Sequence, residues 1–143
     1  MRALAMLAVF AAGSLAVAAD DKEKDKPAIK EIDTKDLKLT FPRGGKGVEP
    51  TTITSAEDLA KNGVVSKSAD EIMKKVDFAK EKLVVFAWAG SGQDKLASEL
   101  KTADNKSTAT FALTRGLTRD LRQHIHLYVV PKDAEVKVEG AGK

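Results

Sequence analysis

The sequence predicts an α+β domain, in which a mainly antiparallel β-sheet carries two short helices packed at one face or end. Three observations lead to this prediction. The helix-start signals all lie between residues 55 and 76. From residue 83 to residue 138 strand-like runs alternate with turns, whereas a parallel doubly wound sheet would need helices between those strands. The apolar run at 83–89 is typical of a central strand covered on both faces.

The N-terminal residues have the pattern of a secretory signal peptide at 1–19. Arg2 precedes an apolar run, and small residues follow before Asp20. The run is too short to cross a bilayer comfortably, and no second one follows. We therefore expect an exported protein, periplasmic or extracellular after cleavage, with no membrane span in the mature chain. The charged residues 20–28 are predicted to be a disordered spacer, 29–139 a single domain and 140–143 a tail.

Composition limits the possible chemistry. The 143 residues include no cysteine, which excludes disulfides, thiolate metal ligands and cysteine nucleophiles. Lysine and arginine total 24 against 21 acidic residues, for a formal charge of +3, and the two signs are interleaved. Nucleic-acid binding needs clustered basic residues with aromatic platforms. We therefore expect no nucleic-acid partner.

The first ordered elements are predicted from alternation and capping. Apolar residues alternate with polar ones at 37–41, which indicates a half-buried strand ended by Pro42, followed by a glycine-rich turn at 43–47 and a short β-prone stretch at 51–53. Ser55 with Asp58 and Ser68 with Glu71 have the spacing of capping boxes, so each serine should begin a short helix. The first helix should bury Leu59 and end near Asn62, and the second should bury Ile72, Met73 and Val76.

The remaining elements are predicted to be strands. Asp104 and Asn105 predict a tight turn between paired strands at 95–100 and 108–113. Further strands are expected at 125–130 and 135–138. On the central strand Trp88 shares a face with Val84 and Phe86, which favours a role in core packing over ligand stacking.

Two polar connections attached to core strands are the candidate binding site, at 90–94 and 115–122. Loops fixed on a rigid sheet are where binding groups are usually placed. If the second connection folds over the first, Asp94 could pair with an arginine of that connection while Gln93 and the glycine amides stay free for a ligand. Alternatively, the arginines satisfy nearby carboxylates and close one end of the sheet. The candidate residues are Gln93, Asp94, Arg115, Arg119 and Arg122, and Arg119 and Arg122 are the expected partners of Asp94.

His124 and His126 are weak candidates for metal ligands. Their spacing in a strand places both imidazoles on one face, where Tyr128 is the next side chain. A metal site needs a third ligand, so a metal-binding protein or metal-dependent enzyme is the alternative hypothesis. A solvated strand face carrying two histidines is the simpler interpretation.

Two glycine-rich segments do not match catalytic or phosphate-binding motifs. Residues 88–92 lack the Gly-x-Ser-x-Gly spacing of a hydrolase nucleophile, and Lys46 is not followed by the Ser or Thr of a phosphate loop. Gly90 and Gly92 are instead expected to permit positive backbone dihedrals and a close turn. No cofactor is predicted, and binding is favoured over catalysis.

Residues 77–94, which begin Asp-Phe and continue through the apolar strand into Gly-Ser-Gly-Gln-Asp, resemble a family of small exported uncharacterised bacterial proteins of the planctomycete type. So do residues 118–133. More distantly, Asp-Phe before an apolar strand and glycine turn is similar to the PrcB C-terminal-like domain. The resemblance implies a non-enzymatic, β-rich module. We predict an exported, non-catalytic binding or accessory module whose two polar connections contact a protein or anionic ligand in the cell envelope.

Overall fold

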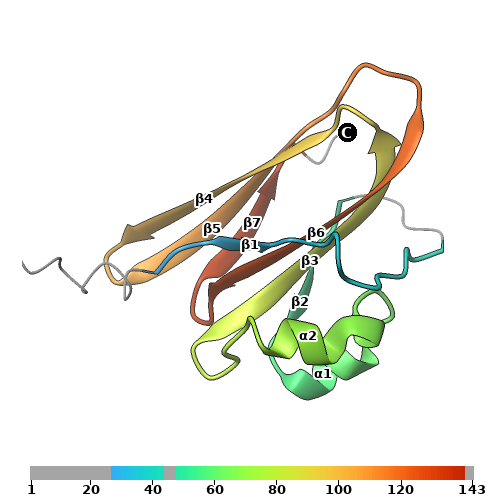
Figure 1. Cartoon of the computed structure of the whole chain (residues 1–143). Helices are drawn as coiled ribbons and strands as arrows, with labels where there is room; N and C mark the ends of the chain where they lie inside the picture. Colours follow the sequence, from blue (N-terminus) through green and yellow to red (C-terminus); the bar gives the residue numbers. More distant parts are fainter. Residues whose placement is uncertain (1–26, 44–47, 141–143) are drawn as a thin grey trace, which may run out of the picture.

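The computed structural model describes residues 27–43 and 48–140 (Figure 1). The predicted signal peptide at 1–19, most of the spacer at 20–28, the glycine turn at 44–47 and residues 141–143 lie outside the described residues. Strands dominate the described part, and two short helices accompany them. The predicted α+β class is therefore confirmed.

The strands form two sheets. The first sheet is antiparallel and has the order β1 (Lys30–Ile32), β6 (Leu121–Pro131), β3 (Glu81–Ser91), β2 (Thr51–Ile53). The second sheet has the order β4 (Lys95–Ala103), β5 (Lys106–Thr114), β7 (Glu135–Glu139), with β4 and β5 antiparallel and β5 and β7 parallel. The chain passes between the sheets after β3 and after β5, which places both predicted polar connections at crossings from one sheet to the other.

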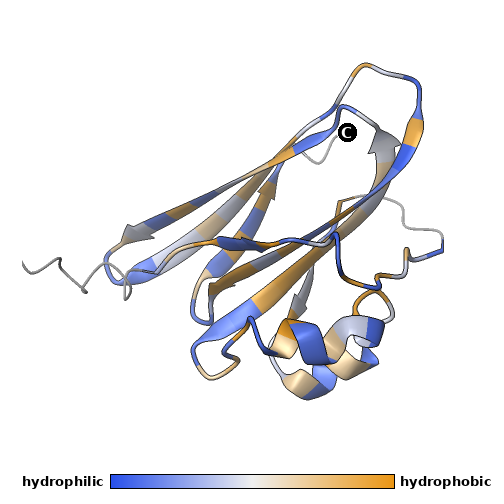
Figure 2. Ribbon diagram, viewed as in Figure 1, coloured by the Kyte–Doolittle hydropathy of each residue, from blue (hydrophilic) through white to orange (hydrophobic). Residues whose placement is uncertain are grey.

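β3 lies at the centre of the fold, as predicted. Its alternate side chains enter two different cores, because successive residues of a strand point to opposite faces. Leu83 and Val85 belong to the core beneath the helices. Phe86 and Trp88 belong to the core between the sheets, where the rings of Phe86 and Phe111 lie 4.8 Å apart. Figure 2 shows the resulting apolar band along β3.

The helices pack over the face of the first sheet that points away from the second. They are α1 (Ala56–Lys61), the 3₁₀ turn η2 (Ser66–Ser68) and α2 (Ala69–Met73). The predicted start of α1 is confirmed, because Ser55 Oγ accepts a hydrogen bond from the Asp58 amide at 3.1 Å. Leu59 and Ile72 are buried as predicted. Met73 is 41% exposed, contrary to prediction, because it directly follows Ile72 and the helix turns its side chain about 100° away from the buried one.

Ser68 precedes α2, as predicted, but does not cap it through its side chain. Its Oγ accepts a hydrogen bond of 2.7 Å from the amide of Lys38 instead. The segment predicted as a strand at 37–41 is not a strand. Its backbone is bound to the helical region, where the Thr40 amide donates to Val64 at 2.9 Å. Leu37 and Leu39 still face apolar neighbours there, which explains the strand-like alternation.

The β4–β5 hairpin has the predicted turn. Ala103 pairs with Lys106, and between them Asp104 and Asn105 have φ values of 50° and 59°. Two successive left-handed residues are the mark of a type I′ turn, whose twist matches that of the flanking strands. Within the described residues, no helix combines the length and apolar character that crossing a membrane requires.

Candidate functional site

The two polar connections meet at one end of the molecule. We call them together the tip, meaning residues 90–94 and 115–122. The first part leaves β3 and enters β4, and the second leaves β5 and enters β6, so both are anchored in both sheets. Figure 1 shows the tip at the end opposite the helices. The structure therefore brings together two segments that are far apart in the sequence.

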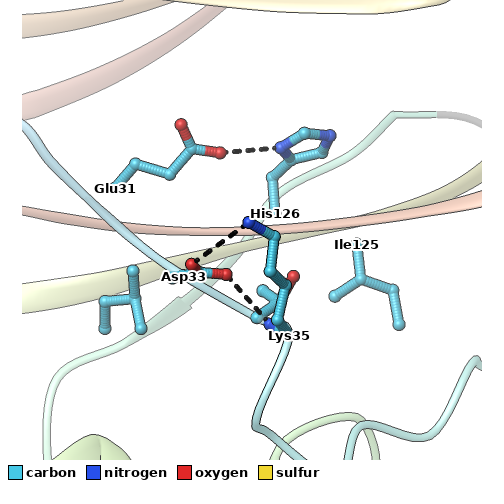
Figure 3. A pocket seen from close by; sticks show the side chains of 7 residues that line it. Glu31, Asp33, Lys35, Ile125 and His126 are labelled. Atoms are coloured by element: carbon cyan, nitrogen blue, oxygen red, sulfur yellow. Dashed lines mark hydrogen bonds and ion pairs between the residues drawn. The ribbon is translucent and has the colours of Figure 1, made fainter.

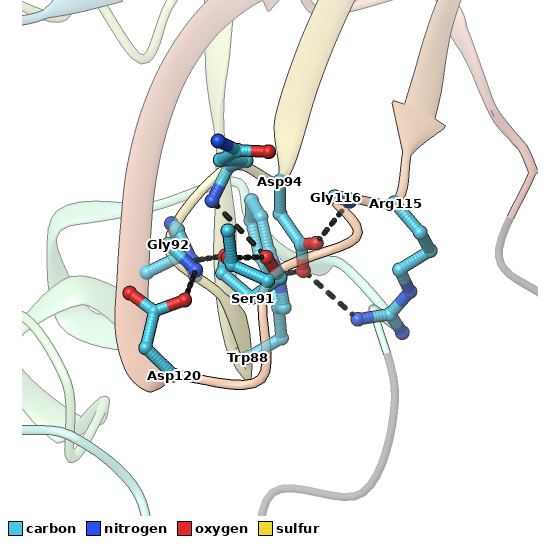
Figure 4. Close-up of polar contacts among 10 residues, drawn as sticks. Trp88, Ser91, Gly92, Asp94, Arg115, Gly116 and Asp120 are labelled. Carbon is cyan, nitrogen blue, oxygen red and sulfur yellow. Dashed lines mark hydrogen bonds and ion pairs between the residues drawn. The ribbon is translucent and has the colours of Figure 1, made fainter.

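Asp94 connects the two parts of the tip through its buried side chain. Its side chain has 0% exposure. Its carboxylate accepts hydrogen bonds from Trp88 Nε1 at 2.9 Å, Arg115 Nη1 at 3.0 Å and the Gly116 amide at 2.8 Å (Figure 4). Burial alone would raise the pKa of Asp94, but the hydrogen bonds from Gly116, Trp88 and Arg115 outweigh it and the pKa is lowered. Asp94 is therefore a buried anion with a structural role.

The predicted partner of Asp94 is wrong. Asp94 pairs with Arg115, not with Arg119 or Arg122. Arg122 lies in β6 and its Nε donates to Asp120 at 2.8 Å. Arg119 is exposed and forms no ion pair with a described residue. Asp94 directly precedes β4 and Arg115 directly follows β5, and the adjoining residues Lys95 and Thr114 are paired, so Arg115 lies beside the carboxylate.

Glycines allow the two connections to approach each other closely. A Cβ atom on Gly90 would overlap the Asp94 carboxylate and lie 2.8 Å from Arg115 Nη1. A Cβ on Gly116 would lie 2.6 Å from Gln93 Cβ. The expected positive dihedrals at Gly90 and Gly92 are wrong, because Gly140 is the only glycine with positive φ in the described ranges. The predicted close turn is present, but glycine is needed there because the space is too small for a Cβ atom, not because of the backbone dihedral.

A second set of polar contacts closes the outer part of the tip. The hydroxyls of Ser91 and Thr118 share a hydrogen bond, and the Gly92 amide donates to Asp120 at 3.2 Å. The Gly92 amide is therefore not free for a ligand, contrary to prediction. Hydrogen bonds from Thr118, Arg122 and Gly92 lower the pKa of Asp120 to about 2. Gln93 is exposed, and only its backbone amide is used, donating to Ser91 Oγ at 3.2 Å.

A pocket of about 580 Å³ opens beside these contacts. Of the candidate residues, Gln93 and Arg115 line this pocket, whereas Asp94, Arg119 and Arg122 do not. Leu117, which lines the pocket, is 95% exposed, and Leu121, the first residue of β6, is 81% exposed. The lining residues are Gly92, Gln93, Lys95, Thr114, Arg115, Gly116 and Leu117.

The two exposed leucines were not among the predicted site residues. In the sequence they lie in Arg-Gly-Leu-Thr-Arg-Asp-Leu-Arg, where each leucine has polar or charged neighbours on most sides. An isolated exposed leucine needs no explanation. Here Leu117 lines the pocket, and Leu121 lies four residues further on, at the start of β6.

His124 and His126 lie on one face of β6, as predicted. Both rings stack on Trp88, with centroid distances of 4.8 and 5.3 Å. His124 Nε2 contacts the Ser91 carbonyl at 2.8 Å, and His126 Nδ1 contacts Glu31 Oε1 at 2.9 Å.

His126 and Glu31 line a second pocket, of about 370 Å³ (Figure 3). Within the ranges 27–43 and 48–140, no three His, Cys, Asp or Glu residues are grouped closely enough to hold a metal ion. A ring nitrogen of each histidine is already used in a protein contact. The contacts that the structure shows for the two histidines are ring stacking and hydrogen bonding.

We compared the chain with protein-family models, curated proteins and solved structures, and none of the three comparisons finds a match.

Proposed function

We propose that this protein is an exported, non-catalytic binding or accessory module, and that its tip binds a protein partner which presents acidic side chains beside an apolar one. The observation that carries the proposal is the exposure of Leu117 and Leu121, at 95% and 81%, on a connection held in place by a buried carboxylate. Leucines at such a position lower the free energy of a complex when a partner removes them from water.

The charges of the tip favour an acidic partner. Asp94 and Asp120 each form an ion pair with an arginine of the tip. Arg119 and Lys95 have no ion-pair partner among the described residues, and Arg115 remains 46% exposed while it pairs with Asp94. Positive charge is therefore left on the surface around the leucines. Such a surface attracts acidic groups and accelerates their association.

The rigidity of the tip also supports a binding role. The hydrogen bonds to Asp94 and the close packing at Gly90 and Gly116 fix the connection before a partner arrives. A preorganised loop loses less conformational entropy on binding than a mobile one. The export pattern of residues 1–19 agrees with an accessory role in the cell envelope.

The test is affinity capture from a cell-envelope extract with the native chain and four variants. The side chains of Leu117 and Arg119 are exposed and form no hydrogen bond or ion pair with a described residue. Leu117→Ser and Arg119→Glu should therefore both fold. Matched controls are Met73→Ser and Lys74→Glu, at the C-terminal end of α2 and away from the tip. A captured protein is identified by mass spectrometry, purified and titrated against all four variants.

We expect the native chain and the α2 variants to bind alike, and each tip variant to weaken binding about tenfold or more. Inorganic phosphate is titrated separately, with the melting temperature as the readout. A phosphate effect that Arg119→Glu removes would identify an anionic ligand in place of a protein. If tip and control variants behave alike in both assays, the tip is not a binding surface and the proposal fails.

A further inference from the structure

β4 is a long strand at one edge of the second sheet. It spans nine residues, and among the residues that the structure describes it pairs with β5 alone. β1 and β2, the outer strands of the first sheet, have three residues each. Figure 1 shows the β4–β5 hairpin extending away from the first sheet. A long edge strand presents unpaired backbone groups that can pair with another strand.

The hairpin turn determines which backbone groups face outward. A two-residue type I′ turn closes on a pair that exchanges both backbone hydrogen bonds, and here that pair is Ala103 and Lys106. Hydrogen-bonded pairs alternate along the ladder. The odd-numbered residues of β4 therefore bond to β5, and the amides and carbonyls of the even-numbered residues point to the free edge. These are Leu96, Ser98, Leu100 and Thr102.

We propose that β4 pairs with β4 of a second copy of this chain, antiparallel and centred on Leu100, and so joins the two second sheets into one continuous sheet. In this register Leu100 lies opposite Leu100 of the partner on the two-fold axis. Ser98 lies opposite Thr102, Glu99 opposite Lys101 and Ala97 opposite Ala103. The free backbone groups of Ser98, Leu100 and Thr102 then all find partners. A self-complementary patch is what a two-fold dimer requires.

The charges of the strand favour this register. Two opposite-charge pairs form between Glu99 and Lys101 across the axis. A register centred on Glu99 would place that residue against itself, and one centred on Ser98 would place Lys95 against Lys101. Directly opposed like charges destabilise paired strands. A register centred on Ala97 pairs only residues 95–99 of β4.

The apolar side chains agree with the same axis. Leu96 and Leu100 are partly buried against the core between the sheets. Two Leu100 side chains meeting on the axis would cover their remaining exposed surface. Pairing on this edge would also remove the aggregation risk that a long free strand presents. The paired residues 97–103 of β4 lie outside the tip, so this pairing is independent of the proposed binding surface.

The first test is sedimentation equilibrium over a concentration series, on protein purified from cells that express the full chain. We expect a monomer–dimer equilibrium. Glu99→Lys and Lys101→Glu should each raise the dissociation constant about tenfold, because each turns two attractive pairs into two repulsive ones. The double variant restores both pairs and should restore dimerisation. Both residues are exposed and pair with each other within one strand at 3.2 Å, so the monomer should fold in every variant.

The second test uses the absence of cysteine from the native chain. Leu100→Cys should form a disulfide-linked dimer under mild oxidation, because the residue faces itself across the axis. Ala97→Cys is the matched control and should not, since Ala97 faces Ala103. The double variant Ala97→Cys with Ala103→Cys should again crosslink. A monomer at every concentration would overturn the proposal, as would a dimer that neither the charge exchange nor the position of the cysteine affects.

Discussion

The indole Nε1 of Trp88 donates a hydrogen bond of 2.9 Å to the carboxylate of Asp94, six residues further along the chain. Trp88 is 1% exposed and belongs to the core between the sheets. Asp94 in turn accepts from the backbone of Gly116. One carboxylate thus connects the core, the end of β3 and the loop that carries the exposed leucines. The position of the tip is consequently coupled to the packing of the core.

Replacing Asp94 should destabilise the fold strongly. In Asp94→Ala the buried indole of Trp88 and the amide of Gly116 lose their acceptor, and the half-exposed Arg115 loses its ion-pair partner, so we expect the free energy of unfolding to fall by about 3 kcal/mol. Urea unfolding followed by the fluorescence of Trp88, the only tryptophan, measures this loss. The control is Asp133→Ala at an exposed turn, with an expected change within about 0.5 kcal/mol. Similar losses in the two variants would contradict the role given to Asp94.

Gly116 should not tolerate a methyl group. A Cβ there would lie 2.6 and 2.7 Å from the Cβ and carbonyl carbon of Gln93, so Gly116→Ala must push two loops apart. We expect a loss of about 2 kcal/mol in the free energy of unfolding. Gly63→Ala is the matched control, because a Cβ at Gly63 meets nothing within 4 Å. Thermal unfolding of both variants decides the matter, and a Gly116→Ala protein as stable as Gly63→Ala would show that the loops are not closely packed.

Ser68 should stabilise the segment around Lys38 and not the start of α2. Its Oγ accepts the Lys38 amide at 2.7 Å and makes no cap hydrogen bond. Ser68→Ala should cost about 1 kcal/mol and increase hydrogen exchange at the Lys38 amide. Ser55→Ala, which removes a real cap, should cost a similar amount and leave exchange at Lys38 unchanged. Unchanged exchange at Lys38 in both variants would mean that the contact with Ser68 does not hold this segment.

Local patterns predicted the parts of the fold that depend on neighbouring residues. The apolar run of β3, the Asp104–Asn105 turn and the Ser55 cap all appear as expected, because their causes lie within a few positions. The strand prediction for residues 37–41 was wrong because the alternation there reflects apolar contacts with the helical region. Alternation alone does not say whether a neighbouring strand is present to pair with. The division into two sheets, with a parallel β5–β7 pair, depends on long-range pairing that no local pattern specifies.

The candidate site was predicted in part for the same reason. The two polar connections do meet, and Gln93, Asp94 and Arg115 come together. Which arginine pairs with Asp94 depends on where β5 ends and β6 begins, a difference of a few residues that sequence patterns do not resolve. Leu117 and Leu121 were missed because an apolar residue is ordinarily read as part of the core. Their exposure follows from the path of the crossover in space.

Stability should decline in acid between about pH 4 and pH 2. Asp120 has a pKa lowered from its ordinary 3.8 to about 2 by hydrogen bonds from Thr118, Arg122 and Gly92, and the pKa of Asp94 is also lowered. A carboxyl with a lowered pKa in the folded state stabilises that state above its unfolded pKa, and this stabilisation is lost as the pH falls through the folded pKa.

Urea unfolding at a series of pH values measures this decline. Asp120→Asn should be less stable than the native protein at neutral pH. It should lose stability less steeply below pH 4, because the side chain at position 120 no longer takes up a proton on unfolding. Asp133→Asn, whose carboxyl is exposed and makes no hydrogen bond or ion pair in the described structure, should keep the native slope. Equal slopes for Asp120→Asn and the native protein would show that this part of the tip does not contribute to acid sensitivity.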